Sequence, residues 1–176
     1  GSFAMANSST PLGGTVNLTQ GSTLQPDGTF KLKELTLNGD INLPIGRGLH
    51  IQEGVTLNGT VFLNESTNII LSPGLVTGGT FQVQTTGSAL DIMKVTGTDA
   101  VTLSPTTVVQ GNKATLFRNQ SGGGSLQNHV TNQGLISAQS PADFISLKPD
   151  VFVNEGTLEA KNGAFLDIDY RTRWSN

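Results

Sequence analysis

The chain has 176 residues, the size of one domain, and its 22 glycines and charged fraction of 13% favour short strands and tight turns over helices. A net charge of −3 leaves no basic stripe for a phosphate backbone, so we expect no nucleic-acid partner. The absence of cysteine excludes disulfides and thiolate metal sites, and the lack of a long apolar run predicts no membrane insertion.

The two ends of the chain differ in character from its middle. Residues 1–5 look like the remnant of a cleaved expression tag, and residues 6–13, which are small and polar, predict a flexible leader. Residues 171–176 are expected to form a C-terminal tail. We therefore assign the fold to residues 14–170, and we expect the chain to be a segment of a longer protein.

From residue 14 onward, apolar residues recur at every second position in short runs, which is the pattern of half-buried strands. Small and turn-forming residues separate the runs. The first strands are expected, in chain order, at residues 15–18, 29–37, 40–43, 49–51, 55–57, 60–63, 68–71, 80–83 and 89–92.

A repeat of 20 residues organises these strands. Residues 35–39 (LTLNG) return as residues 55–59 (VTLNG), and a third, less regular copy begins at Leu75. Apolar residues at equivalent places, such as Leu37 and Leu57, would then stack in columns. A fixed period of this length, with strand-like alternation inside each copy, predicts a solenoid whose coils stack in parallel.

A second family of repeats lies toward the C-terminus. Residues 132–138 reappear as residues 154–160 at an offset of 22, and residues 144–147 reappear as residues 165–168 at an offset of 21. Each repeat in this family is therefore one or two residues longer than in the first family, and we place the added residues in a loop because the strand patterns still align. Between the two families, residues 111–129 hold three consecutive glycines and few apolar residues, so we expect an irregular loop there.

The outward positions of the strands also repeat. The threonines that share a phase are Thr36, Thr56 and Thr96, with Val76 in the missing place, and, in a second phase, Thr60 and Thr80. Stacked β-branched residues of this kind stabilise an exposed strand face. The pairs at residues 38–39, 58–59 and 78–79, which are Asn-Gly or Gly-Gly, are expected at corners that require a positive φ.

The Asn-Gly pairs leave a second fold open, because Asn-Gly between alternating strands is also the strongest short-range signal for a β-hairpin. Hairpins would give an antiparallel sandwich. A sandwich predicts no fixed period, whereas three copies in register favour parallel stacking. We therefore expect an all-β fold, a single-stranded solenoid of about seven coils.

A resemblance to a known repeat class is carried by the strings LTLNGDINL, VTLNGTVFLNESTNIILSPGLVTGGTFQV, VTNQGLISAQ and VNEGTLEAKNGAFLDI. They resemble the β-helical repeats of large exported bacterial surface proteins, of the filamentous-haemagglutinin-like and autotransporter-passenger-like kinds. The resemblance covers residues 29–168. It implies a right-handed parallel β-helix, exported and displayed at or beyond the cell surface, and it supplies no catalytic motif.

The two histidines of the chain give little support for catalysis. A Ser-His-Asp hydrolase needs a histidine held between a nucleophile and a carboxylate. His50 lies between two apolar residues and is expected to face solvent, and His129 is expected to be a loop residue beside the glycine-rich segment. We therefore predict no catalytic residue, no metal site and no cofactor.

One group of carboxylates could act on carbohydrate. Asp167 and Asp169 lie on the same face of a strand, Glu159 lies one stretch earlier, and Tyr170 and Trp174 are nearby. A solvated outer face explains the same residues without a ligand. We call these five residues the predicted carbohydrate face and keep them as an alternative.

The sequence favours a structural segment without catalysis, a scaffold within a cell-surface or secreted bacterial adhesin-like protein. Its partners would be neighbouring segments of that larger protein, and host or matrix glycans, and it would be a monomer or associate weakly end to end. The alternative is a carbohydrate-binding or polysaccharide-degrading β-helix that uses outer carboxylates. A third hypothesis, an ice binder, is disfavoured because Val76 interrupts the threonine rank.

Overall fold

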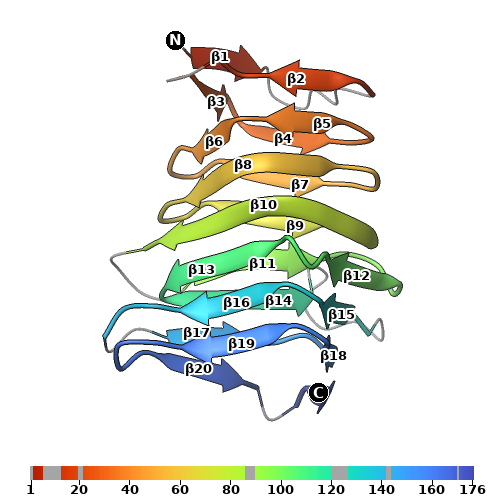
Figure 1. Cartoon of the computed structure of the whole chain (residues 1–176), viewed down its shortest axis with the longest axis vertical. Coiled ribbons are helices and arrows are strands. Elements are labelled where there is room, and N and C mark those ends of the chain that lie inside the picture. Colours follow the sequence, from red (N-terminus) through yellow and green to blue (C-terminus); the bar gives the residue numbers. More distant parts are fainter. Residues whose placement is uncertain are drawn as a thin grey trace.

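The computed structural model describes residues 2–5, 13–19, 22–85, 90–119, 127–141, 144–169 and 171–176. Within these ranges every regular element is a strand and no helix occurs. The strands lie across the long axis in stacked layers, with the N-terminus at one end and the C-terminus at the other (Figure 1). The prediction of an all-β fold is therefore confirmed for the described residues.

The described strands form two sheets. The smaller sheet has seven strands, β4 (Thr29–Leu32), β7 (Gly48–Ile51), β9 (Asn68–Leu71), β11 (Leu90–Val95), β14 (Ala114–Asn119), β17 (Phe144–Leu147) and β20 (Phe165–Ile168). The larger sheet has fourteen, β1 (Ser2–Met5), β2 (Thr15–Asn17), β3 (Thr23–Pro26), β5 (Thr36–Asn38), β6 (Asp40–Leu43), β8 (Thr56–Leu63), β10 (Gly74–Gln84), β12 (Ala100–Leu103), β13 (Val108–Asn112), β15 (His129–Asn132), β16 (Leu135–Ala138), β18 (Val151–Asn154), β19 (Thr157–Ala160) and β21 (Arg173–Ser175).

Each described strand pairs in parallel with strands about one repeat away in the chain. Thr36 of β5 pairs with Thr56 of β8, and Phe144 of β17 pairs with Phe165 of β20. Strands β16 and β19 pair at the offset of 22 residues seen in the sequence. Both repeat families are therefore confirmed as neighbours in space, and the parallel pairing rules out the antiparallel sandwich for the described strands.

Equivalent apolar side chains stack in columns inside the molecule. One column of the smaller sheet consists of Phe30, Leu49, Ile69 and Met93. A column of the larger sheet consists of Ile41, Val61, Phe81, Val109 and Ile136. All of these side chains are at most 1% exposed and belong to one hydrophobic core, so each contributes on the order of 2 kcal/mol through burial. The predicted stacking of Leu37 on Leu57 is also confirmed.

The predicted 20-residue register is wrong at the entry to β10. Ile51 pairs with Leu71, an offset of 20, but Leu57 pairs with Gly78, an offset of 21. The segment between Leu71 and Thr77, which includes the start of β10, therefore holds one residue more than the segment between Ile51 and Thr56. A bulge after Gly78 restores the offset of 20, so that Thr80 pairs with Thr60 as predicted.

The extra residue changes the outward threonine rank. The rank consists of Thr15, Thr36, Thr56 and Thr77. Val76, which we expected to interrupt it, is 2% exposed and packs in the core. Thr96, which we expected to belong to it, instead follows β11 in the smaller sheet, where its N–H donates to the carbonyl of Leu71 over 3.0 Å.

The corner glycines meet two different requirements. Gly39 and Gly78 have positive φ angles, 129° and 71°, as predicted. Gly59 has no positive φ, and β8 runs through it without a break. A Cβ on Gly59 would lie 2.1 Å from the carbonyl oxygen of Gly39. Glycine is therefore required at this position by the close approach of two backbones.

Three boundaries differ from those expected. Ser2–Met5 form β1, which pairs with β3, although we placed residues 1–5 outside the fold. Arg173–Ser175 form β21, which pairs with β18, although we expected a tail. In the expected loop at residues 111–129, residues 111–112 belong to β13, residues 114–119 to β14 and residue 129 to β15. Residues 120–126, like most of the expected leader, lie outside the described residues. The added strands form because an open parallel edge offers unpaired N–H and C=O groups.

The close approach at Gly59 predicts a large effect of a single methyl group. We expect Gly59→Ala to lower the free energy of unfolding by about 3 kcal/mol or more, since neither backbone can move away without breaking its ladder. The matched control is Gly46→Asn, because Gly46 has a positive φ of 77° that Asn tolerates and nothing lies near a Cβ there. Urea unfolding measures both, and equal midpoints for Gly59→Ala and the unmodified chain would contradict the geometry.

Candidate functional site

The structure distributes the predicted carbohydrate face over both sheets. Glu159 belongs to β19 and Trp174 to β21 in the larger sheet, whereas Asp167 belongs to β20 in the smaller sheet. Asp169 follows directly after β20, and Tyr170 lies outside the described residues. The Trp174 side chain is 57% exposed.

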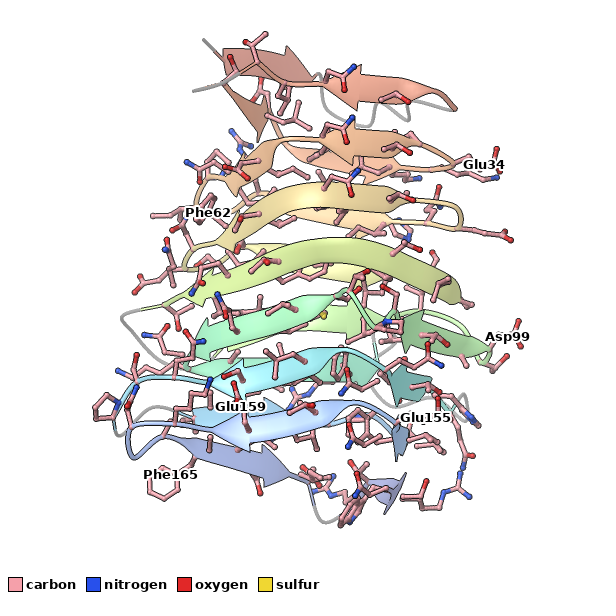
Figure 2. The ribbon with its side chains drawn as sticks, viewed as in Figure 1. Glu34, Phe62, Asp99, Glu155, Glu159 and Phe165 are labelled. Carbon is pink, nitrogen blue, oxygen red and sulfur yellow. The ribbon has the colours of Figure 1, made fainter. Side chains whose placement is uncertain are left out.

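Glu159 is held as an ionised carboxylate by its neighbours. It accepts a hydrogen bond of 2.8 Å from the Ser137 hydroxyl and forms an ion pair with the Lys161 ammonium over 2.7 Å. The hydrogen bond from Lys161, and next the one from Ser137, lower the pKa of Glu159. Figure 2 shows Glu159 on the outside of the layers formed by β16 and β19. A general acid for glycoside cleavage needs the opposite, a raised pKa, so Glu159 is unsuited to that role.

Asp167 and Asp169 are both held by the layer that precedes them. Asp167 accepts a hydrogen bond of 3.2 Å from the Ser146 hydroxyl. Asp169 lies 3.7 Å from the Lys148 ammonium and accepts a hydrogen bond of 3.0 Å from the backbone N–H of Arg171. The two carboxylates therefore have separate partners, and of the two Asp169 is the one that faces a concave surface.

A pocket of about 340 Å³ opens where the chain leaves β14, β17 and β20, three stacked strands of the smaller sheet. Its described lining residues are Arg118, Asn119, Lys148, Pro149, Asp150, Asp169, Arg171 and Thr172. Three cations and two carboxylates thus meet in one pocket. The three cations are notable because the whole chain has only ten Lys and Arg residues.

Hydrogen bonds between layers fix the walls of this pocket. The N–H of Lys148 donates to β14 and the N–H of Asp169 donates to β17, each over 2.9 Å. The hydroxyl of Thr172, which is nearly buried, donates to the carbonyl of Pro149 over 2.7 Å. The residues that follow β17 and β20 are therefore each held against the strand of the preceding layer.

The buried side chain of Asn128 connects the pocket to the core. Its amide nitrogen donates to the carbonyl of Phe117 over 2.6 Å, and its oxygen accepts from the N–H of Asp150 over 2.6 Å. The N–H of Asn128 in turn donates to the Asp150 carboxylate over 2.9 Å. Phe117 has a φ of 67°, which is rare for a bulky residue and is typical of functional sites. Asn128 thus stabilises a strained backbone directly behind Arg118.

Sequence reasoning did not group the three cations, because the repeat does not connect them. Arg118, Lys148 and Arg171 stand 30 and 23 residues apart, whereas the repeats have periods of 20 to 22 residues. One signal was present, because each cation lies at or just beyond the end of a strand in the smaller sheet. Only the stacking of those strands shows that the three positions share one corner.

His50 faces outward, as predicted, but it is partly buried. Its Nε2 lies 2.7 Å from the Ser72 hydroxyl of the next layer, and Lys31 of the previous layer pairs with it in register. Burial, and then the charge of Lys31, lower the pKa of His50. His129 is the first residue of β15 rather than a loop residue. Both histidines therefore act as parts of the stacked strands.

No protein-family model, no curated protein and no solved structure matches this chain. Among the described residues, no group of three or more His, Asp and Glu side chains could hold a metal ion. In the same part of the chain, no helix is long and apolar enough to cross a membrane.

The lowered pKa of His50 predicts a pH-dependent stability. The unfolded chain takes up the proton near the ordinary pKa of 6.5, whereas the folded chain takes it up only at lower pH. The part of the free energy of unfolding that depends on neutral His50 should therefore be fully present above pH 6.5. It should be lost as the pH drops through 6.5 toward the pKa of the folded chain. Urea midpoints at about pH 7.5 and about pH 5.5 measure this decrease.

The substitution His50→Gln should remove this decrease, and the matched control His129→Gln should retain it. A decrease of the same size in His50→Gln as in the unmodified chain would exclude His50 as its source.

Proposed function

We propose that the chain is a structural scaffold without catalysis, a single-stranded right-handed parallel β-helix of about seven coils. The observation that carries this proposal is the parallel pairing in register from β1 to β21. The seven strands of the smaller sheet would each mark one coil. Such a scaffold fits a segment of a large bacterial surface or secreted adhesin-like protein, located at or outside the cell surface.

Rows of amide side chains support a rigid scaffold. Neighbouring amides in these rows, each from a different layer, bond side chain to side chain. The rows are Asn17, Asn38 and Asn58; Gln82, Gln110 and Gln139; and Asn132, Asn154 and Asn176. The third row is largely inside the molecule, where Asn132 is fully buried and its amide donates to Asn154 over 2.8 Å. Amide ladders of this kind bind identical positions of successive strands and disfavour a slip of register.

The outermost strands suggest what such a scaffold would contact. Strands β19, β20 and β21 each pair on one side only, and Leu166 and Ile168 of β20 are only partly buried. Open edges of this kind accept further strands. We therefore propose neighbouring segments of a larger protein as partners at this end. Two copies of the chain would associate weakly through the same open edges.

A second candidate function is carbohydrate binding, and the pocket beside Asp169 favours it. The pocket combines cations, carboxylates and an amide, which are the groups that bind acidic sugars. Host or matrix glycans are the candidate partners for this function. Polysaccharide cleavage is not favoured, because Glu159, Asp167 and Asp169 each have separate partners.

The scaffold proposal predicts no cleavage of polysaccharide. A reducing-sugar assay on a panel of acidic polysaccharides should show no release above the buffer blank with the unmodified chain. Release that is lost in Asp167→Asn and retained in Asp27→Asn would overturn the proposal. Asp27 is a matched control because it pairs with Arg47 over 3.3 Å in an early layer, far along the chain from β20.

A further inference from the structure

We propose that the pocket at the ends of β14, β17 and β20 binds the carboxylate of a uronic acid, with the sugar hydroxyls on its acidic wall. This proposal deepens the carbohydrate-binding candidate by naming the class of sugar. It does not depend on the scaffold proposal, which the cleavage assay tests separately.

The cations account for recognition of a carboxylate. Arg118, Lys148 and Arg171 line one pocket in a chain whose net charge is −3, so the pocket is a local exception to the charge of the whole chain. Guanidinium groups match the geometry of a carboxylate, and an ammonium adds donors that rotate freely. Each cation comes from a different layer, so the stacking of the layers assembles the group.

Lys148 is the cation best placed to turn toward a ligand. Its ammonium lies 3.7 Å from Asp169, which is longer than an N–H···O hydrogen bond, and its side chain is 31% exposed. Arg118 and Arg171 already interact with neighbouring groups, and a ligand would join that network. Lys148 is therefore the side chain through which the proposal is tested.

The two carboxylates of the pocket favour binding of a uronic acid over binding of a phosphate. Asp150 and Asp169 also line the pocket, and their fixed negative charges would repel a doubly charged phosphate more than a singly charged carboxylate. The same oxygens accept hydrogen bonds from sugar hydroxyls. Asn119 adds an amide that can both donate and accept. A ligand with one negative charge and several hydroxyl groups fits this combination.

The size and construction of the pocket agree with one sugar ring. Its volume of about 340 Å³ lies at the lower end of the range for small-molecule sites, about 300–1,000 Å³. Its walls are held by the nearly buried hydroxyl of Thr172 and the buried amide of Asn128, so the site is formed before a ligand arrives. Phe165, the exposed first residue of β20, points away from the stack (Figure 2) and does not belong to the lining of the pocket.

The experiment is an isothermal titration of the full chain at low salt with D-glucuronate, D-glucose and inorganic phosphate. Glucuronate and glucose differ at C6, where glucuronate has the carboxylate. We expect glucuronate to bind, glucose to bind at least about tenfold more weakly, and added salt to weaken the binding of glucuronate. Phosphate should bind more weakly than glucuronate.

Two variants test the assigned residue. Lys148→Met removes the charge but keeps the length of the side chain, and it should weaken glucuronate binding about tenfold or more. Lys161→Met removes a lysine charge that is paired with Glu159, outside the described lining, and it should leave binding unchanged. Thermal unfolding of both variants checks that the fold is retained.

Three results would overturn the proposal. They are no detectable binding of glucuronate to the unmodified chain, equal binding of glucuronate and glucose or phosphate, and unchanged binding in a folded Lys148→Met variant. Should Lys148→Met fail to fold, Lys148→Gln is measured in its place, with the same expected loss.

Discussion

The parallel pairing of each strand with strands about one repeat away is the constraint on which the rest of the structure depends. Because the strands stay in register, each residue lies about 4.8 Å from its equivalents above and below. Equivalent residues must therefore pack against or hydrogen-bond to one another without a clash. Aliphatic side chains do so by burial, as Leu37 does on Leu57, and amides do so by hydrogen bonds, as Asn132 does with Asn154. Where backbones come closer still, as at Gly59, only glycine fits.

Most of the fold could be predicted because this constraint leaves a period in the sequence. The period of 20 residues and the alternation of apolar residues identify the parallel layers and their inward columns. The prediction failed where the period changes, since nothing local shows that the segment between Leu71 and Thr77 holds one more residue. That residue places Thr77, rather than Val76, in the outward rank. The prediction also treated residues 29–37 as one strand, whereas Glu34 adopts a φ of 53° and separates β4 from β5.

The candidate site was much less predictable than the fold. Sequence spacing grouped Asp169 with Asp167 on one strand face, but in the structure Asp169 follows β20, and of the two only Asp169 lines the pocket. Sequence spacing could not identify Arg118 or Lys148, because Arg118 lies near the end of β14 and Lys148 directly follows β17, two strands whose paired residues stand 31 positions apart and meet only through stacking. The contribution of Asn128 depends on a buried contact with the backbone of Phe117, which leaves no pattern in the sequence. Repeats thus predict the layers, whereas the charged side chains of the pocket meet at a corner between layers that no repeat predicts.

The stacking of layers depends on strand register, and engineered disulfides measure that register directly because the chain has no cysteine of its own. Asn38 pairs with both Asn17 and Asn58, so neighbouring layers place these Cα atoms about 4.8 Å apart and alternate layers about twice as far. The double variant Asn38→Cys/Asn58→Cys should therefore form a disulfide on mild oxidation, and Asn17→Cys/Asn58→Cys should remain reduced. Ready formation of the second disulfide, or failure of the first in a folded chain, would contradict the stacking of layers in register.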